Sequence, residues 1–286
     1  MTSHDVVARV RRVLGTRRVG HAGTLDPMAT GVLVLGVERG TRLLGHLALR
    51  DKDYDATVRL GSSTVTDDAE GEVVSRADAS VLAAVGDSAI LAACAAQRGV
   101  VHQRPSAVSA IKVDGQRAYA RVRAGQDVQL PAREVHIERL EVRDIRRSAD
   151  AIDVDIAVTC STGTYVRAIA RDAGEALGVG GHLTALRRTR VGPFTLAQAV
   201  ALDDAATGLQ GLDTAVPSCF PVIDLDDTCA ADVRVGRPMV WPGGDLDTGP
   251  HALRDATGRV LALAERDGAR LHYLVVLSPS QADADG

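Results

Sequence analysis

Residues 20–31 read Gly20-His21-Ala22-Gly23-Thr24-Leu25-Asp26-Pro27-Met28-Ala29-Thr30-Gly31, and this stretch decides how the chain is interpreted. Its three glycines and one proline predict a loop. The apolar run at 32–37 that follows predicts a buried strand. Taken alone, Asp26 before a proline is typical of a turn residue. The stretch therefore predicts a loop that carries a carboxylate and leads into a strand.

Five arginines lie within ten residues just upstream of this loop. They are Arg9, Arg11, Arg12, Arg17 and Arg18. Apolar residues at 6, 7, 10, 13 and 14 share one face of a predicted helix, which Gly15 ends. A charge run of this kind is usually a solvated helix face, and a patch that binds phosphates is the alternative.

Downstream of the loop, alternating and helical patterns predict an α+β fold, with a mixed, largely antiparallel sheet and flanking helices. Strands are expected at 54–60, 134–143, 152–159 and 182–191, and helices at 81–96 and 164–177. An acidic turn region spans 62–71. The segment 102–126 is polar and basic, with the length of an insertion.

From about residue 201 the sequence changes to Asp, Gly and Pro with short apolar runs. Strands are expected at 233–240, 260–264 and 271–277, which predicts a small C-terminal β module. Residues 1–200 hold 27 Lys and Arg against 23 Asp and Glu, whereas residues 201–286 hold 6 against 14. We therefore expect a mildly basic domain over 1–205, an acidic β module over 206–280 and a disordered tail over 281–286.

Composition narrows the class of protein. With 286 residues, 45% of them hydrophobic and 24% charged, the chain has the make-up of a globular protein. Its apolar runs are too short to span a membrane, and its start lacks a secretory pattern. Its four cysteines lie far apart and form no CxxC pair, which indicates reduced thiols, with a structural zinc site as the minor alternative. We expect a cytoplasmic monomer.

The 20–31 loop resembles the GHxGTLDPxAxGVL motif of the TruB family of tRNA pseudouridine synthases. Further segments match family motifs in order over roughly residues 2–200. They are Asp53-Tyr54, Thr66–Gly71, Arg104–Lys112 with Gly115–Ala120, Ser161–Arg167 and Leu183–Arg188. Val65 and Asp67 depart from the family's TDTxDxxG turn. Family members usually carry a Lys-Pro-x-Gly strand ahead of the position of Thr2, so an uncovered sheet edge is expected here.

The resemblance implies a reaction and a partner. Members of the family convert uridine to pseudouridine in the T-loop of tRNA, at position 55, after flipping the base out. The conversion is an isomerisation, so no cofactor is required. By resemblance Asp26 is the catalytic carboxylate; attack on C1′, attack on the base and assisted glycosidic cleavage all remain open. The C-terminal module resembles a PUA-like RNA-binding barrel.

The resemblance also implies roles for other residues. Arg167 would pair with Asp26 and hold it ionised and oriented, and Tyr54 would stack on the uracil and take the C5 proton. Tyr165 would line the pocket, Leu186 would form its apolar wall, and His21 would fill the gap left by the flipped base. The arginines at 9–18 and segment 117–123 would hold RNA phosphates. Without the resemblance, each is an ordinary surface, turn or core residue.

Two other classes of function are compatible with parts of the pattern. One is a non-catalytic RNA-binding or tRNA-folding protein on the same scaffold, against which the intact Asp26, Tyr54 and Arg167 speak. The other is a glycosidase or nucleosidase with an Asp nucleophile, but no second acid stands at motif spacing. Mapping pseudouridine in treated RNA would distinguish the three.

Overall fold

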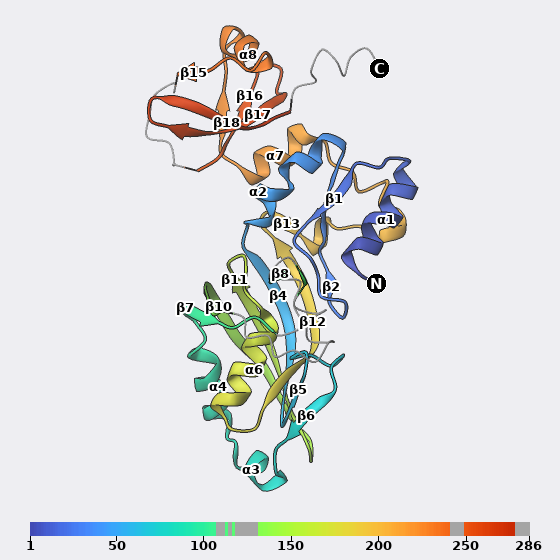
Figure 1. Ribbon diagram of the computed structural model, residues 1–286, viewed down its shortest axis with the longest axis vertical. Coiled ribbons are helices and arrows are strands. Elements are labelled where there is room, and N and C mark those ends of the chain that lie inside the picture. Colours follow the sequence, from blue (N-terminus) through green and yellow to red (C-terminus); the bar gives the residue numbers. More distant parts are fainter. Residues whose placement is uncertain (107–111, 114–115, 118–130, 241–248, 278–286) are drawn as a thin grey trace. The chain divides into compact units, whose positions relative to one another are not determined.

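The computed structural model describes residues 1–106, 112–113, 116–117, 131–240 and 249–277. The chain divides into two compact units (Figure 1). The first contains Met1–Ser3, Thr24–Leu33 and Ala48–Ala197, and the second contains His4–Gly23, Val34–Leu47 and Gln198–Gly286. Most of the predicted 102–126 insertion, and all of the predicted 281–286 tail, lie outside the described residues.

A seven-stranded sheet forms the centre of the first unit. Its order is β13 (Phe194–Thr195), β12 (Gly181–Val191), β4 (Lys52–Leu60), β11 (Ile152–Cys160), β10 (Arg133–Arg147) and β7 (Gly99–Gln103). These neighbours pair antiparallel, and β2 (Thr30–Gly31) adds to β12 in parallel. The predicted α+β class with a mixed, largely antiparallel sheet is confirmed.

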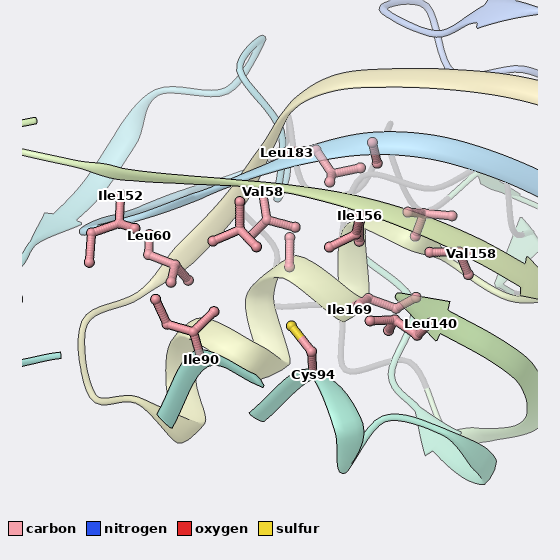
Figure 2. Close-up of a cluster of buried hydrophobic side chains, with 14 of the residues drawn as sticks. Val58, Leu60, Ile90, Cys94, Leu140, Ile152, Ile156, Val158, Ile169 and Leu183 are labelled. Carbon is pink, nitrogen blue, oxygen red and sulfur yellow. The ribbon is translucent and has the colours of Figure 1, made fainter. Parts of the chain in front are cut away.

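Two helices, α4 (Asp87–Ala95) and α6 (Val166–Ala176), bury their apolar sides with one face of this sheet in a single core. Strand β4 alternates, so that Tyr54, Ala56, Val58 and Leu60 enter the core while Asp53 and Asp55 face outward. Figure 2 shows Ile90 and Cys94 on α4 facing residues of the strands. The expected helix at 81–96 is two helices, α3 (Ala79–Ala84) and α4, because the chain turns extended at Val85 and Gly86.

Two short hairpins complete the first unit. Strands β5 (Ser62–Thr64) and β6 (Val73–Arg76) pair antiparallel and enclose the acidic turn that was predicted between them. Strands β8 (Lys112–Val113) and β9 (Gln116–Arg117) form the second hairpin. The first hairpin matters for the site, because its turn carries Asp67 and Asp68.

The second unit begins with α1 (Ser3–Leu14), whose valines pack on the hairpin of β1 (Val19–Ala22) and β3 (Val34–Val37). Two short helices follow, η1 (Glu38–Leu43) and α2 (Leu44–Ala48). The predicted strand at 32–37 begins only at Val34. Val32 instead donates its amide to the carbonyl of Arg188, so the chain docks on β12 before β3 starts.

The C-terminal part of the second unit is the expected small β module. Its sheet order is β14 (Val222–Asp224), β16 (His251–Arg254), β17 (Val260–Asp267), β18 (Arg270–Val276) and β15 (Met239–Val240). Helices α7 (Leu212–Cys219) and α8 (Asp227–Arg234) accompany it, after the short η2 (Leu196–Gln198) and η3 (Leu202–Asp204).

The predicted strand at 233–240 is wrong over most of its length. Its first two residues end α8, and only Met239 and Val240 are extended. The helix begins because the Asp226 carboxylate accepts the amide of Cys229 at 2.7 Å, an N-cap that the apolar run concealed. Val233 is then fully buried from a helical position in the core of the module.

Candidate active site

The loop around Asp26 is held by its backbone at several points. The amide of Ala29 donates to the carbonyl of Asp26 at 2.9 Å and closes the Asp-Pro turn. Before the turn, the amide of Leu25 donates to the hydroxyl of Ser3 at 2.9 Å. After it, Val32 is bonded to β12 at 2.8 Å. The Asp26 carboxylate is therefore on a defined loop, and with its side chain 32% exposed it remains reachable.

Arg167 lies in the first turn of α6 and makes the central contact of the site. Its Nη2 donates to Oδ1 of Asp26 at 3.0 Å. Its Nη1 donates to Oδ2 of Asp68 at 3.3 Å and to the carbonyl of Thr66 at 2.9 Å. Only 6% of the side chain is exposed, so the pairing takes place away from water, where charge-assisted hydrogen bonds are strong.

Asp68 is a site residue that the sequence analysis quoted in a motif but gave no role. Its side chain is 4% exposed, and one carboxylate oxygen accepts the amide of Glu70 at 3.1 Å. Thr64 donates its hydroxyl to the Asp68 carbonyl at 2.7 Å. A buried carboxylate with fixed partners orients the guanidinium of Arg167 from the side opposite Asp26. The sequence feature that could have identified Asp68 as a site residue was the turn motif at 66–71 that contains it.

Tyr54 and Leu186, two further predicted site residues, lie in the sheet. Both are buried members of the main core, on β4 and β12 respectively. Burial raises the pKa of Tyr54 to about 12, although the charge of Arg188 and its hydrogen bond oppose the rise. The negative charge of Asp26 makes a smaller contribution to the rise of this pKa.

Tyr165 stands two residues before Arg167, as the N-cap residue of α6. Its amide donates to Oε1 of Gln103 at 2.9 Å, and its side chain is half-buried. The first unit thus brings together Asp26, Arg167 and Asp68 by direct contact. Tyr54 and Leu186 stay predicted members of the site.

His21 and the five upstream arginines belong to the second unit. His21 lies on β1, and its ring meets that of His4 edge-on with centroids 5.7 Å apart. Arg9 pairs with Asp203, Arg11 donates to the carbonyl of Val19, and Arg18 lies 3.9 Å from Glu38. Arg12 and Arg17 are exposed and make no ion pair with any described residue. The RNA contacts of these six residues stay predictions.

Two further features of the described residues concern metal ions and membranes. They contain no group of three or more His, Cys, Asp or Glu side chains placed to bind a metal ion. None of their helices has the length and hydropathy needed to cross a membrane.

Three family models match successive parts of the chain between residues 11 and 278. The N-terminal domain of the TruB family pseudouridylate synthases matches residues 11–166. The tRNA pseudouridylate synthase B C-terminal domain matches 167–213, and the C-terminal model of tRNA pseudouridine synthase II matches 220–278. These models describe one class of enzyme, the pseudouridine synthases.

The chain belongs to the TruB family of this class. It is 51% identical to tRNA pseudouridine synthase B of Corynebacterium diphtheriae, over 98% of this chain and 93% of that protein. It is 56% identical to the protein of the same name from Mycolicibacterium paratuberculosis, over 98% and 94%. Among solved structures, a Cbf5-Nop10-Gar1 complex matches with a TM-score of 0.74 and 25% identity, over 98% of this chain and 82% of that chain.

Proposed function

We propose that this pseudouridine synthase converts uridine to pseudouridine in tRNA, at position 55 of the T-loop, with Asp26 as the catalytic carboxylate. The observation that carries the proposal is the contact of Asp26 with the buried Arg167, on the loop that resembles the family's motif. The names of the relatives support tRNA as the substrate. We further propose that the protein acts as a monomer in the cytoplasm.

Each step of the reaction can be assigned to residues of the proposed site. The N1–C1′ bond of uridine breaks, the base turns, a C5–C1′ bond forms, the C5 proton leaves, and N1 takes up a proton. Asp26 stabilises or attacks the electron-poor centre, and Arg167 orients its carboxylate. Tyr165 lines the pocket and Leu186 gives it an apolar wall. His21 fills the space of the flipped base, and Arg9, Arg11, Arg12, Arg17 and Arg18 hold phosphates.

The protonation state of Tyr54 decides whether its phenolate can be the base that removes the C5 proton. With its pKa raised to about 12, only about one phenol in 10⁵ is ionised at pH 7. A phenolate base would therefore be scarce in the free enzyme. The proposal that follows is that Tyr54 contributes its ring for stacking and its neutral hydroxyl for hydrogen bonding.

The function is tested by mapping pseudouridine in tRNA treated with the purified protein. Unmodified tRNA transcript should gain one pseudouridine, at position 55, and a transcript with cytidine at that position should gain none. Binding of the transcript without conversion would support the non-catalytic alternative, which nothing in the comparisons favours. Release of free uracil would indicate a glycosidase instead.

Replacing Tyr54 by Phe should lower the single-turnover rate by about 10- to 100-fold, because the ring remains and only the hydroxyl is lost. Affinity for tRNA should change by less than about threefold, since stacking is retained. Rapid-quench assays and filter binding measure the two quantities. A wild-type rate that climbs tenfold for each pH unit between 7 and 9 would instead identify the phenolate as the base.

Removing two exposed arginines should weaken tRNA binding in a salt-dependent way. In an Arg12→Ser/Arg17→Ser variant, the slope of log affinity against log salt should become shallower by about 1.4, at roughly 0.7 per phosphate contact. The matched control is Arg12→Lys/Arg17→Lys, which keeps both charges and should keep the slope. Equal slopes for the Ser variant and the wild type would place the phosphate contacts elsewhere.

A further inference from the structure

Arg188 is a buried cation to which the proposed chemistry gives no role. It lies on β12 with 1% of its surface exposed, and it is among the largest fully buried side chains of the described residues. Its neighbours Leu186 and Val191 are apolar core residues of the same strand. Burying a guanidinium costs free energy unless its N–H donors are hydrogen-bonded. The hydrogen-bond partners of Arg188 therefore indicate which parts of the structure it stabilises.

The partners of Arg188 are the two sides of the Asp26 loop. Its Nε donates to the carbonyl of Val32 at 2.8 Å, and its Nη1 reaches the carbonyl of Thr24 at 3.4 Å. Its own carbonyl accepts the amide of Val32 at 2.8 Å. One residue of β12 therefore contacts the loop two residues before Asp26 and six residues after it.

The same residue also lies beside Tyr54. Strands β4 and β12 place Arg188 and Tyr54 opposite each other in the sheet. The charge of Arg188 and its hydrogen bonding lower the pKa of Tyr54 against the rise that burial causes. Arg188 thus links the loop that carries the carboxylate to the aromatic residue proposed to stack on the base.

We propose that Arg188 is a positioning residue for the isomerisation, whose guanidinium sets the Asp26 loop and the Tyr54 hydroxyl in one geometry. The inference rests on the proposed function of Asp26 and Tyr54. Arginine suits this task because its planar fork serves several acceptors at once, whereas a lysine ammonium at the same position lacks that planar spread. A displacement of about 1 Å at a reacting group can cost about 10²-fold in rate.

The test begins with Arg188→Lys, which keeps the charge and removes the fork. The single-turnover rate of the folded enzyme should fall by about 100-fold, with tRNA affinity within about threefold of the wild type. Amide exchange over residues 24–32 should become faster. If the wild type itself forms no pseudouridine, the proposed function fails, and the exchange result still decides whether Arg188 holds the loop.

A matched control separates positioning from stability. Arg190 lies on the same strand. Its Nε and Nη2 donate to the two carboxylate oxygens of Asp53, each at 2.8 Å, on the outward side of the sheet. Arg190→Lys should lower the melting temperature but leave the single-turnover rate within about threefold. Equal rate losses in the Arg188 and Arg190 variants would mean that both only stabilise the sheet, and would overturn the inference.

A further variant keeps the proposal testable if Arg188→Lys does not fold. Gly31 stands against the Arg188 carbonyl with a φ of +97°, and a β-carbon there would lie 2.1 Å from that oxygen. Gly31→Ala should therefore push the loop off β12 and reproduce both the rate loss and the faster exchange. A wild-type rate in a folded Gly31→Ala variant would contradict the inference.

The double variant Arg188→Lys/Tyr54→Phe tests whether Arg188 positions the Tyr54 hydroxyl. If Arg188 orients the Tyr54 hydroxyl, removing that hydroxyl should cost less than about threefold once Arg188 is Lys, because the two residues act as a unit. Fully additive rate losses would show that Tyr54 works without the guanidinium.

Discussion

Asp26→Asn is expected to reduce the single-turnover rate of pseudouridine formation by at least about 10³-fold, or roughly 4 kcal/mol in activation free energy. The amide has nearly the shape of the carboxylate but carries no charge and is a poor nucleophile. Binding of tRNA should survive, because the proposed phosphate contacts come from arginines. The variant should therefore saturate with tRNA and turn it over very slowly.

The measurement is a rapid-quench assay of folded protein, with a filter-binding titration beside it. Asp153→Asn is the matched control, since that acid also pairs with an arginine, Arg59, at 2.8 Å, but on the sheet away from the Asp26 loop. It should keep its rate within about threefold. Retention of more than about a tenth of the wild-type rate by Asp26→Asn, roughly a 1.4 kcal/mol effect, would exclude the catalytic role.

Arg167→Lys is expected to give the second large effect, a loss of at least about 100-fold in single-turnover rate. Three acceptors meet this guanidinium: the carboxylates of Asp26 and Asp68 and the carbonyl of Thr66. An ammonium keeps the charge but cannot repeat that arrangement, so the carboxylate of Asp26 loses its orientation. Affinity for tRNA should change little, because the side chain is buried.

Arg171→Lys is the natural control, because Arg171 lies one turn along α6 and contacts a neighbouring acid, Asp67, at 3.2 Å. Its rate should stay within about threefold of the wild type. Asp68→Asn should fall between the two, since it leaves Arg167 in place but removes one of its charged partners. A rate in Arg167→Lys equal to that of Arg171→Lys would mean that Asp26 does not depend on this contact.

Much of the fold follows from local pattern. Alternation in β4 predicts which side chains enter the core, and the structure places Ala56, Val58 and Leu60 there. The 3.6-residue spacing predicts α1 and α6 in the same way. Local pattern fails at 233–240, where a single capping carboxylate, Asp226, outweighs an apolar run that suits a strand equally well.

The sequence by itself determined the residues of the candidate site that a motif contains: Asp26 in its loop, Arg167 and Tyr54. The tertiary structure alone decided their partners. Arg167 lies 141 positions from Asp26 and 99 from Asp68, and Arg188 lies 156 from Val32. The periodicity of apolar residues in a helix or strand carries no information about contacts between residues this far apart in the sequence. The physical reason is that a sheet joins strands that are remote along the chain, so a buried charge finds its partners only when the fold closes.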